Sequence, residues 1–155
     1  MRLQLLAVLL CSLASATAGT QPCHLGFIQH KASCYWFSNI NGSFAEASAY
    51  CRYMESHLAT IANKDEDDFL RGRAIRRGKA ESYWLGATDL NLEGRWLWEG
   101  RRPMVYSNWS PHQPDNYKGR EHCLEMRRSY SNYLWNDVPC YAFNGKSHFI
   151  CEKEV

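Results

Sequence analysis

Oxygen-bearing side chains concentrate in one polar segment in the second half of the chain, PHQPDNYKGREHC, residues 111–123. A short WND triplet further along adds more of them. Carboxylates and carboxamides, with no cysteine or histidine required, suit Ca²⁺, a hard cation that takes about six to eight oxygen ligands. The candidate calcium ligands are Gln113, Asp115, Glu121, Asn136 and Asp137.

Residues 1–18 have the pattern of a secretory signal peptide. Arg2 precedes the apolar run LQLLAVLLCSL, and small residues follow, with Ala16-Thr17-Ala18 fitting the cleavage rule. The run is too short to span a bilayer, and no second stretch of this kind follows. We therefore expect a secreted, extracellular protein without a membrane span, whose mature chain, residues 19–155, forms a single domain.

The cysteines and the net charge narrow the class of protein further. Of the seven cysteines, Cys11 falls in the signal segment, so six remain. An even number in an oxidising compartment predicts three disulfides, whose pairing the spacing alone leaves open. Removing Arg2 lowers the formal net charge from +2 to +1. A charge this small argues against nucleic acid as a partner.

Two helices are expected in the first half of the chain. Ser43 and Glu46 have the spacing of a capping box, and Asn63 and Gly78 bracket a second segment with acids first and arginines last. One face of the first helix is predicted to hold Phe44, Ala47, Tyr50, Cys51 and Met54.

The second half of the chain has the pattern of short strands. YWLGA, RWLW, MVYSNW, CLEMRR, YLWND and HFICEK are rich in aromatic and branched side chains and are separated by turn residues. These elements predict an α+β fold, with two helices on an irregular antiparallel sheet and a long loop region tied down by disulfides. Loops this long in a compact domain usually carry function.

The order of these motifs resembles the C-type lectin domain. YWLGATD, SNWSPHQPDN, EHC, LWND, the following PC and the terminal FICEK occur in the order of that family, over about residues 23–153. Within the family, the chain is most similar to compact secreted invertebrate lectins of the perlucin-like type. The resemblance implies long-form disulfides, namely Cys23–Cys34, Cys51–Cys151 and Cys123–Cys140.

The resemblance also assigns roles to the oxygen-bearing residues. It implies that Gln113, Asp115, Glu121, Asn136 and Asp137 ligate a sugar-binding calcium. For an auxiliary second calcium, the matching positions are Asp89, Glu93, Asn116 and Glu121. His122 departs from the family pattern because it stands where an acid is often found.

A sugar specificity follows from the same resemblance. A calcium held by five side chains keeps coordination positions for two neighbouring sugar hydroxyls, which the carboxylates and amides can also hydrogen-bond. In this family the Gln-Pro-Asp order of residues 113–115 usually marks galactose and N-acetylgalactosamine. Tyr117 stands where an aromatic ring can stack on galactose. The glycine-rich loop of the strongest galactose binders is replaced by KGR, which leaves mixed specificity open.

Rival functions and a modification site complete the expectations. The same fold can serve as a structural or protein-interaction module, such as a biomineral-matrix protein, and a glycan array would separate the two. No credible nucleophile–base pair or H-E-x-x-H spacing supports an enzyme. No coiled-coil neck is present, so a homo-oligomer would form through the domain surface. Asn41 lies in an N-glycosylation sequon, N-G-S.

Overall fold

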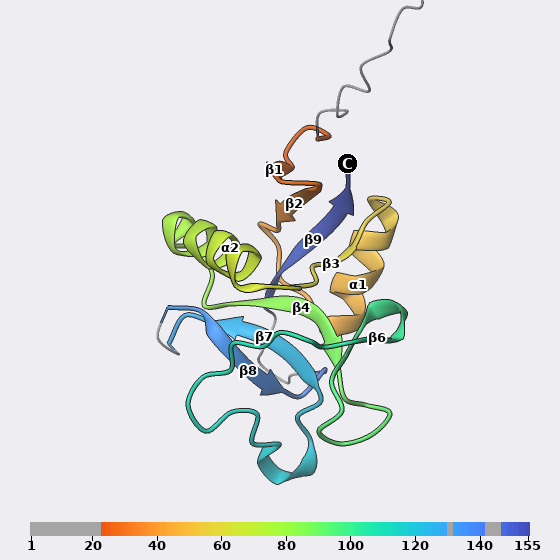
Figure 1. The fold of residues 1–155 in the computed structure, drawn as a ribbon, viewed down its shortest axis with the longest axis vertical. Coiled ribbons are helices and arrows are strands. Elements are labelled where there is room, and N and C mark those ends of the chain that lie inside the picture. Colours follow the sequence, from red (N-terminus) through yellow and green to blue (C-terminus); the bar gives the residue numbers. More distant parts are fainter. Residues whose placement is uncertain (1–22, 130–131, 142–146) are drawn as a thin grey trace, which may run out of the picture.

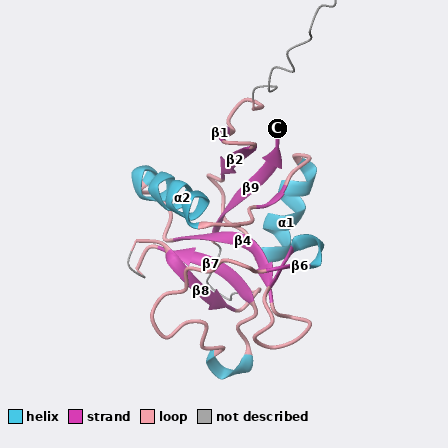
Figure 2. Ribbon diagram, viewed as in Figure 1, coloured by secondary structure: helices cyan, strands magenta, loops and turns pink. Residues whose placement is uncertain are grey.

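The computed structural model describes residues 23–129, 132–141 and 147–155, so the predicted signal segment lies outside the described residues. Two helices flank the upper part of a strongly twisted sheet, and long loops form its lower end (Figures 1 and 2). The upper elements are β1 (Ile28–His30), β2 (Ser33–Phe37), α1 (Phe44–Tyr53), β3 (His57–Leu58), α2 (Lys64–Arg77) and β9 (His148–Glu154). The remaining elements are β4 (Ser82–Thr88), β5 (Leu97–Trp98), η1 (Glu99–Arg101), β6 (Arg102–Pro103), η2 (Tyr117–Gly119), β7 (Cys123–Arg127) and β8 (Leu134–Val138).

Helix α1 begins where the capping box predicts. The backbone N–H of Glu46 donates to Ser43 Oγ at 3.3 Å, and the backbone N–H of Ser43 donates to Glu46 Oε2 at 2.8 Å. Ala47 and Cys51 are buried as expected. Tyr50 was predicted to share their face but is 37% exposed, with its ring stacked on Trp36, and Met54 lies just past the end of the helix as its C-cap.

Helix α2 also has the ends that the sequence predicts. Asn63 accepts a hydrogen bond from the backbone N–H of Glu66 at 3.1 Å. Gly78 ends the helix in the left-handed conformation, with φ of 61°, and its N–H donates to the carbonyl of Ala74. Acids in the first turn and arginines in the last complement the helix dipole.

The sheet differs from the expected pattern in three respects. Strand β4 pairs with β9 in parallel, although the other strand pairs are antiparallel. The predicted strand over MVYSNW is wrong: residues 104–108 are irregular, and only Trp109 forms an isolated bridge, to Trp135. The short strands β1, β2 and β3 were not anticipated, and β2 and β3 both pair with β9.

The structure has the three disulfides that the resemblance implies. Cys51–Cys151 joins α1 to the centre of β9 across 100 residues of sequence. Cys123–Cys140 joins the start of β7 to the segment just after β8, and Cys23–Cys34 closes the N-terminal hairpin. The Cys123–Cys140 bridge holds together the two segments that carry the candidate calcium ligands.

Aromatic side chains fill the core between the helices and the lower strands. Trp84 and Trp135 are fully buried, and Trp96 and Trp98 nearly so. Close packing also explains Gly86 in β4, since a Cβ atom there would lie 2.7 Å from the carbonyl oxygen of Leu58. This rigid core lies directly behind the lower loops.

Candidate functional site

Three carboxylates from distant parts of the chain converge in the lower loops. One oxygen each from Asp115, Glu121 and Asp137 lies within 4.8 Å of the others. Asp115 and Glu121 lie on either side of the short turn η2, at the bottom of Figure 1, and Asp137 lies in β8. The structure therefore brings together three of the five predicted ligands.

Asp137 is the fixed member of this group. Its side chain is buried, and its two oxygens accept hydrogen bonds from the backbone N–H groups of Asp115 at 3.1 Å and Asn116 at 2.8 Å. A strand residue thus anchors the loop by its backbone. Because these bonds use only the backbone of Asp115, its carboxylate can belong to the cluster with Glu121 and Asp137.

Glu121 is held by the loop itself. Its Oε2 accepts from the backbone N–H of Tyr117 at 2.9 Å, and its own N–H donates to Asn116 Oδ1 at 3.0 Å. Asn116 can serve this turn because asparagine tolerates the left-handed conformation that it adopts, with φ of 42°. The loop is therefore organised by its own polar groups.

The electrostatics of the three carboxylates are unfavourable without a cation. Burial, which is the largest cause, and the neighbouring charges of Asp137 and Asp115 together raise the pKa of Glu121 to about 7, against the lowering effect of the Tyr117 N–H. Burial also raises the pKa of Asp137, although its backbone hydrogen bonds oppose the shift. Like charges this close disfavour joint ionisation, and a bound divalent cation would reverse that effect.

The two predicted amide ligands have different surroundings. Gln113 is half-buried, and its Oε1 is buried without a hydrogen-bond partner. The Gln113–Pro114 peptide bond is cis. Asn136 is buried and donates from Nδ2 to Glu125 Oε1 at 3.2 Å, which leaves its Oδ1 as the available ligand atom. A buried oxygen without a hydrogen-bond partner is the kind of neutral ligand that a hard cation such as Ca²⁺ accepts.

Tyr117 has the exposure required of a stacking residue. Its side chain is 61% exposed, and Lys118 Nζ lies 5.1 Å from the centre of its ring. Only its backbone N–H is committed, to Glu121. The ring is thus available to an apolar sugar face, at the expense of its contact with Lys118.

A buried carboxylate behind the site was not singled out from the sequence. Asp67 of α2 accepts from Trp135 Nε1 at 2.8 Å and from Asn108 Nδ2 at 2.5 Å. Trp135 directly precedes Asn136 and Asp137 on β8, so Asp67 fixes the strand that carries two predicted ligands. The sequence offered only a row of acids at the start of α2, which the helix dipole already explained.

The candidate residues for the second calcium are only partly brought together. Asp89 and Glu93 lie beside His122, with one ligand atom from each of the three within 4.8 Å of the others. Asn116 and Glu121, the other two members of the predicted set, hydrogen-bond to each other through Asn116 Oδ1. This group therefore has a nitrogen ligand that the predicted oxygen set lacked.

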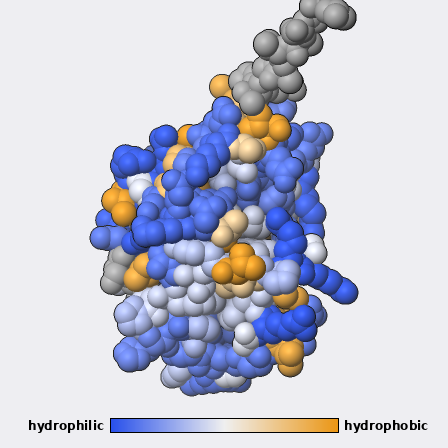
Figure 3. All heavy atoms as spheres, viewed as in Figure 1, coloured by the Kyte–Doolittle hydropathy of each residue, from blue (hydrophilic) through white to orange (hydrophobic). Residues whose placement is uncertain are grey.

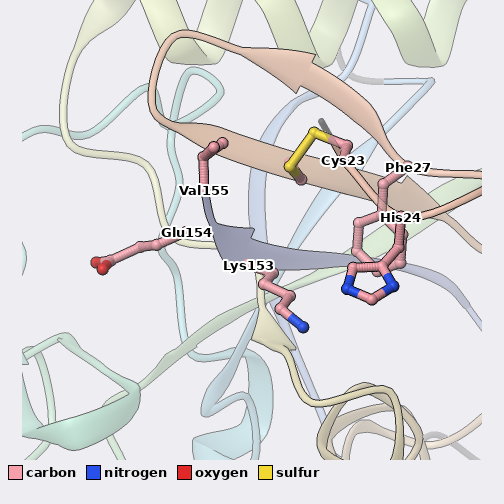
Figure 4. Close-up of a pocket in the computed structure, with 7 residues that line it drawn as sticks. Cys23, His24, Phe27, Lys153, Glu154 and Val155 are labelled. Atoms are coloured by element: carbon pink, nitrogen blue, oxygen red, sulfur yellow. A yellow bond between two sulfur atoms is a disulfide. The ribbon is translucent and has the colours of Figure 1, made fainter. Parts of the chain in front are cut away.

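A small cavity lies elsewhere. It measures about 70 Å³ and lies beside the Cys23–Cys34 disulfide, where His24, Phe27 and the last residues of β9 line it (Figure 4). This end of the sheet is opposite the η2 turn (Figure 1). The residues that line this cavity include none of the predicted ligands.

Comparison with known proteins now identifies the family, because residues 40–153 match the model of the Lectin C-type domain. The chain belongs to the C-type lectin family. It is 67% identical over 132 residues to perlucin from Haliotis laevigata, which covers 85% of this chain and 83% of perlucin. It is 32% identical over 154 residues to asialoglycoprotein receptor 2 from Mus musculus, which covers 96% of this chain but 48% of the receptor. The chain thus spans about half the length of that receptor.

A solved structure supports the same assignment. The carbohydrate-recognition domain of the mouse scavenger receptor C-type lectin superposes with a TM-score of 0.77 at 31% identity, over 86% of this chain and 98% of that domain. The α+β C-type lectin fold and the resemblance inferred from the motifs are confirmed. The family comprises carbohydrate-binding domains and generally binds calcium, and neither family nor fold is that of an enzyme.

Proposed function

We propose that residues 19–155 form a secreted, calcium-dependent lectin domain that binds terminal galactose-type sugars, with residues 1–18 as its signal peptide. The proposed calcium ligands are Gln113, Asp115, Glu121, Asn136 and Asp137. Among the described residues, no helix is long and apolar enough to cross a bilayer.

The convergence of Asp115, Glu121 and Asp137 is the observation that carries this proposal. In the part of the chain that the structure describes, no lysine, arginine or histidine forms an ion pair with any of the three. Clustered carboxylates without an internal cation are stable only when they are protonated or bound to an external cation, and oxygen ligands favour Ca²⁺ over softer metals. Gln113, two residues before Asp115, has a buried Oε1 without a hydrogen-bond partner, which could serve as a neutral ligand.

The chain's own side chains would then define the sugar. Bound calcium supplies coordination positions for two neighbouring hydroxyls. Asp115 can only accept a hydrogen bond from a hydroxyl, whereas the Gln113 amide can donate one from Nε2. This donor–acceptor order and the exposed ring of Tyr117 support galactose over mannose, in line with the Gln-Pro-Asp motif.

A galactose column run with calcium and then with chelator tests the proposal. We expect retention in Ca²⁺ and complete elution in EDTA, because removing the cation leaves the carboxylates to repel one another. Acid should also elute the protein, since protons compete with the cation. Retention in EDTA would contradict calcium dependence.

A double substitution tests the sugar specificity separately. Gln113→Glu with Asp115→Asn exchanges acid and amide at the two positions that flank Pro114, with the total charge unchanged. We expect preference on a glycan array to shift from galactose toward mannose. An unchanged array profile would exclude this pair from sugar recognition, and loss of calcium binding would be detected independently by calorimetry.

Affinity for one sugar should be weak. The contact with a monosaccharide is small and wet, so we expect a dissociation constant on the order of millimolar. Useful avidity would require several sites presented together, for which we propose a homo-oligomer formed through the domain surface. On the face shown in Figure 3, apolar side chains lie as separate spots on a largely hydrophilic surface.

Asn41 remains the proposed glycosylation site. Its side chain is exposed immediately before helix α1. The other formal sequon begins at Asn108, which is half-buried and donates to Asp67. Modification is therefore expected at Asn41 alone, and peptide mapping after deglycosylation would check it.

A further inference from the structure

A second group of metal-binding side chains lies beside the proposed calcium site and differs from it in chemistry. Asp89 and Glu93 lie in the loop that follows β4, and His122 directly precedes β7. One ligand atom from each of the three lies within 4.8 Å of the others. The backbone N–H of Asp89 donates to the carbonyl of His122 at 3.2 Å, so the two segments are joined by their backbones as well.

The auxiliary calcium that related domains bind here does not fit these residues. His122 stands where an acid is often found, and its Nδ1 lies 2.9 Å from Asp89 Oδ1 and 3.4 Å from Glu93 Oε2. Calcium takes about six to eight oxygen ligands, and an imidazole nitrogen is a poor substitute for one of them. The histidine also removes one negative charge from the expected set.

Other oxygens of the expected calcium set are already engaged. Asp89 Oδ2 accepts from the backbone N–H of Gly94 at 2.8 Å. Asn116 Oδ1 accepts from the backbone N–H of Glu121 at 3.0 Å. The group around His122 therefore offers two carboxylates, whereas calcium takes about six to eight oxygen ligands.

We propose that Asp89, Glu93 and His122 bind a borderline divalent metal of the Zn²⁺ class in place of a second calcium. Zinc prefers a tetrahedral mixture of nitrogen and oxygen ligands at about 2.0–2.2 Å, which separates neighbouring ligand atoms by about 3.3–3.5 Å. The 3.4 Å from His122 Nδ1 to Glu93 Oε2 matches that separation, and the 2.9 Å hydrogen bond to Asp89 Oδ1 would lengthen by about 0.5 Å when a metal ion replaces its proton. Three protein ligands leave the fourth position to water.

The surroundings of the three ligands suit a metal site that is reached from solvent. Asp89 has a side-chain exposure of only 1% and is oriented by Gly94, as ligating carboxylates commonly are by a hydrogen bond. His122 and Glu93 are 28% and 55% exposed, so a metal can enter between them. Because His122 follows Glu121 directly, zinc here would fix a segment that carries one of the calcium-binding carboxylates.

The competing interpretation is a plain hydrogen-bonded ion pair. In that case Nδ1 of His122 carries a proton that bridges to Asp89, and no metal is needed. The two interpretations differ in whether Nδ1 gives up its proton to a zinc ion. Zinc binding by the protein is therefore the deciding measurement.

Titration of the full mature chain with ZnCl₂, in saturating calcium and without sugar, tests the proposal by calorimetry. We expect one zinc per chain. His122→Asp should weaken zinc binding at least about 10-fold, because even residues that only orient a ligand change metal affinity by 10–100-fold. The same variant restores an oxygen ligand, so calcium bound per chain in a zinc-free titration should rise from one to two.

Two further variants keep this experiment decisive. His112→Asn removes an exposed histidine outside the group, at a left-handed position that asparagine tolerates, and should leave zinc binding unchanged. His122→Gln should also lose zinc binding. This variant takes the place of His122→Asp if circular dichroism shows that the aspartate variant is not folded. Absent zinc binding, undiminished binding by both His122 variants, or two calcium ions on the wild type would overturn the proposal. Failure of galactose binding would leave it standing, because no sugar is present.

Discussion

Asp67 and Asp137 are both buried carboxylates, yet their surroundings give them opposite roles. Burial raises the pKa of each. The oxygens of Asp67 accept from neutral side chains, Trp135 and Asn108, and Arg71 lies 3.8 Å away with a compensating charge. The oxygens of Asp137 accept from backbone amides and face two more carboxylates. Asp67 therefore has its compensating charge inside the protein, whereas Asp137 requires one from outside.

The comparison shows how to separate a structural from a binding carboxylate in this fold. Burial alone does not distinguish them, and neither does the number of hydrogen bonds. The sign of the nearest charges does, because a carboxylate among like charges is stable only when protonated or bound to a cation. Trp135, Asn136 and Asp137 are consecutive on β8. Asp67 therefore holds this strand in place through Trp135, whereas Asp137 belongs to the strand and is a candidate calcium ligand.

Asp137→Asn should give the largest effect on binding. The amide keeps an acceptor for the loop backbone but removes a charged ligand, so calcium affinity should fall at least roughly 100-fold and sugar retention should be lost. Calorimetry measures the calcium affinity, and a galactose column measures the sugar retention. Wild-type calcium affinity would show that Asp137 is structural like Asp67.

Asp67→Ala should produce the converse result. Removing the carboxylate leaves Trp135 Nε1 and Asn108 Nδ2 without an acceptor, which should lower the free energy of unfolding by roughly 2–4 kcal/mol. Calcium affinity of the folded protein should change little by comparison. Urea unfolding in EDTA measures the loss. Asp68→Ala is the matched control, since that neighbour is half-exposed and pairs with Lys64 at the surface.

Local signals predicted the helices, and the resemblance predicted the site. The caps at Ser43, Asn63 and Gly78 depend on side chains within a few residues, so sequence alone could place them. The convergence of the three carboxylates depends on a disulfide and a strand pairing across the chain. Only the order of family motifs could anticipate it.

The remaining features depend on tertiary contacts that leave no local pattern. Residues 104–109 contain aromatic and branched side chains as a strand would, but within this described segment only Trp109 pairs, in an isolated bridge to Trp135. The parallel pairing of β4 with β9 has no signal in either strand. Asp67 was one of several acids at the start of α2, and only its inward position distinguishes it.

The pH dependence of stability should differ with and without calcium. Glu121 has an ordinary pKa of 4.5 and a folded pKa of about 7, so in that interval the calcium-free folded state binds more protons than the unfolded state. The melting temperature in EDTA should therefore fall as pH rises from 4.5 to 7. Calcium should abolish much of this decline, because it favours the ionised form of Glu121.

Scanning calorimetry across this pH range, with Ca²⁺ or EDTA, measures the difference. Asp67 also has a raised pKa, but its contribution is the same in both buffers because it does not ligate the ion. Glu121→Gln should make the melting temperature in EDTA less dependent on pH. The contribution of Asp67 to that dependence should remain. Parallel wild-type curves in the two buffers would refute the assignment of Glu121 as a calcium ligand.

The smallest expected effect separates the sugar contact from the calcium contact. Tyr117→Ala removes an exposed ring but keeps the backbone N–H that holds Glu121. Because an aromatic contact contributes about 0.5–1.5 kcal/mol, galactose affinity should fall roughly 3- to 10-fold while calcium affinity stays constant. Tyr117→Trp should retain or improve galactose binding. If the alanine variant instead lost calcium, the ring would be part of the scaffold that organises the loop, in the manner of Trp135 rather than of Asp115.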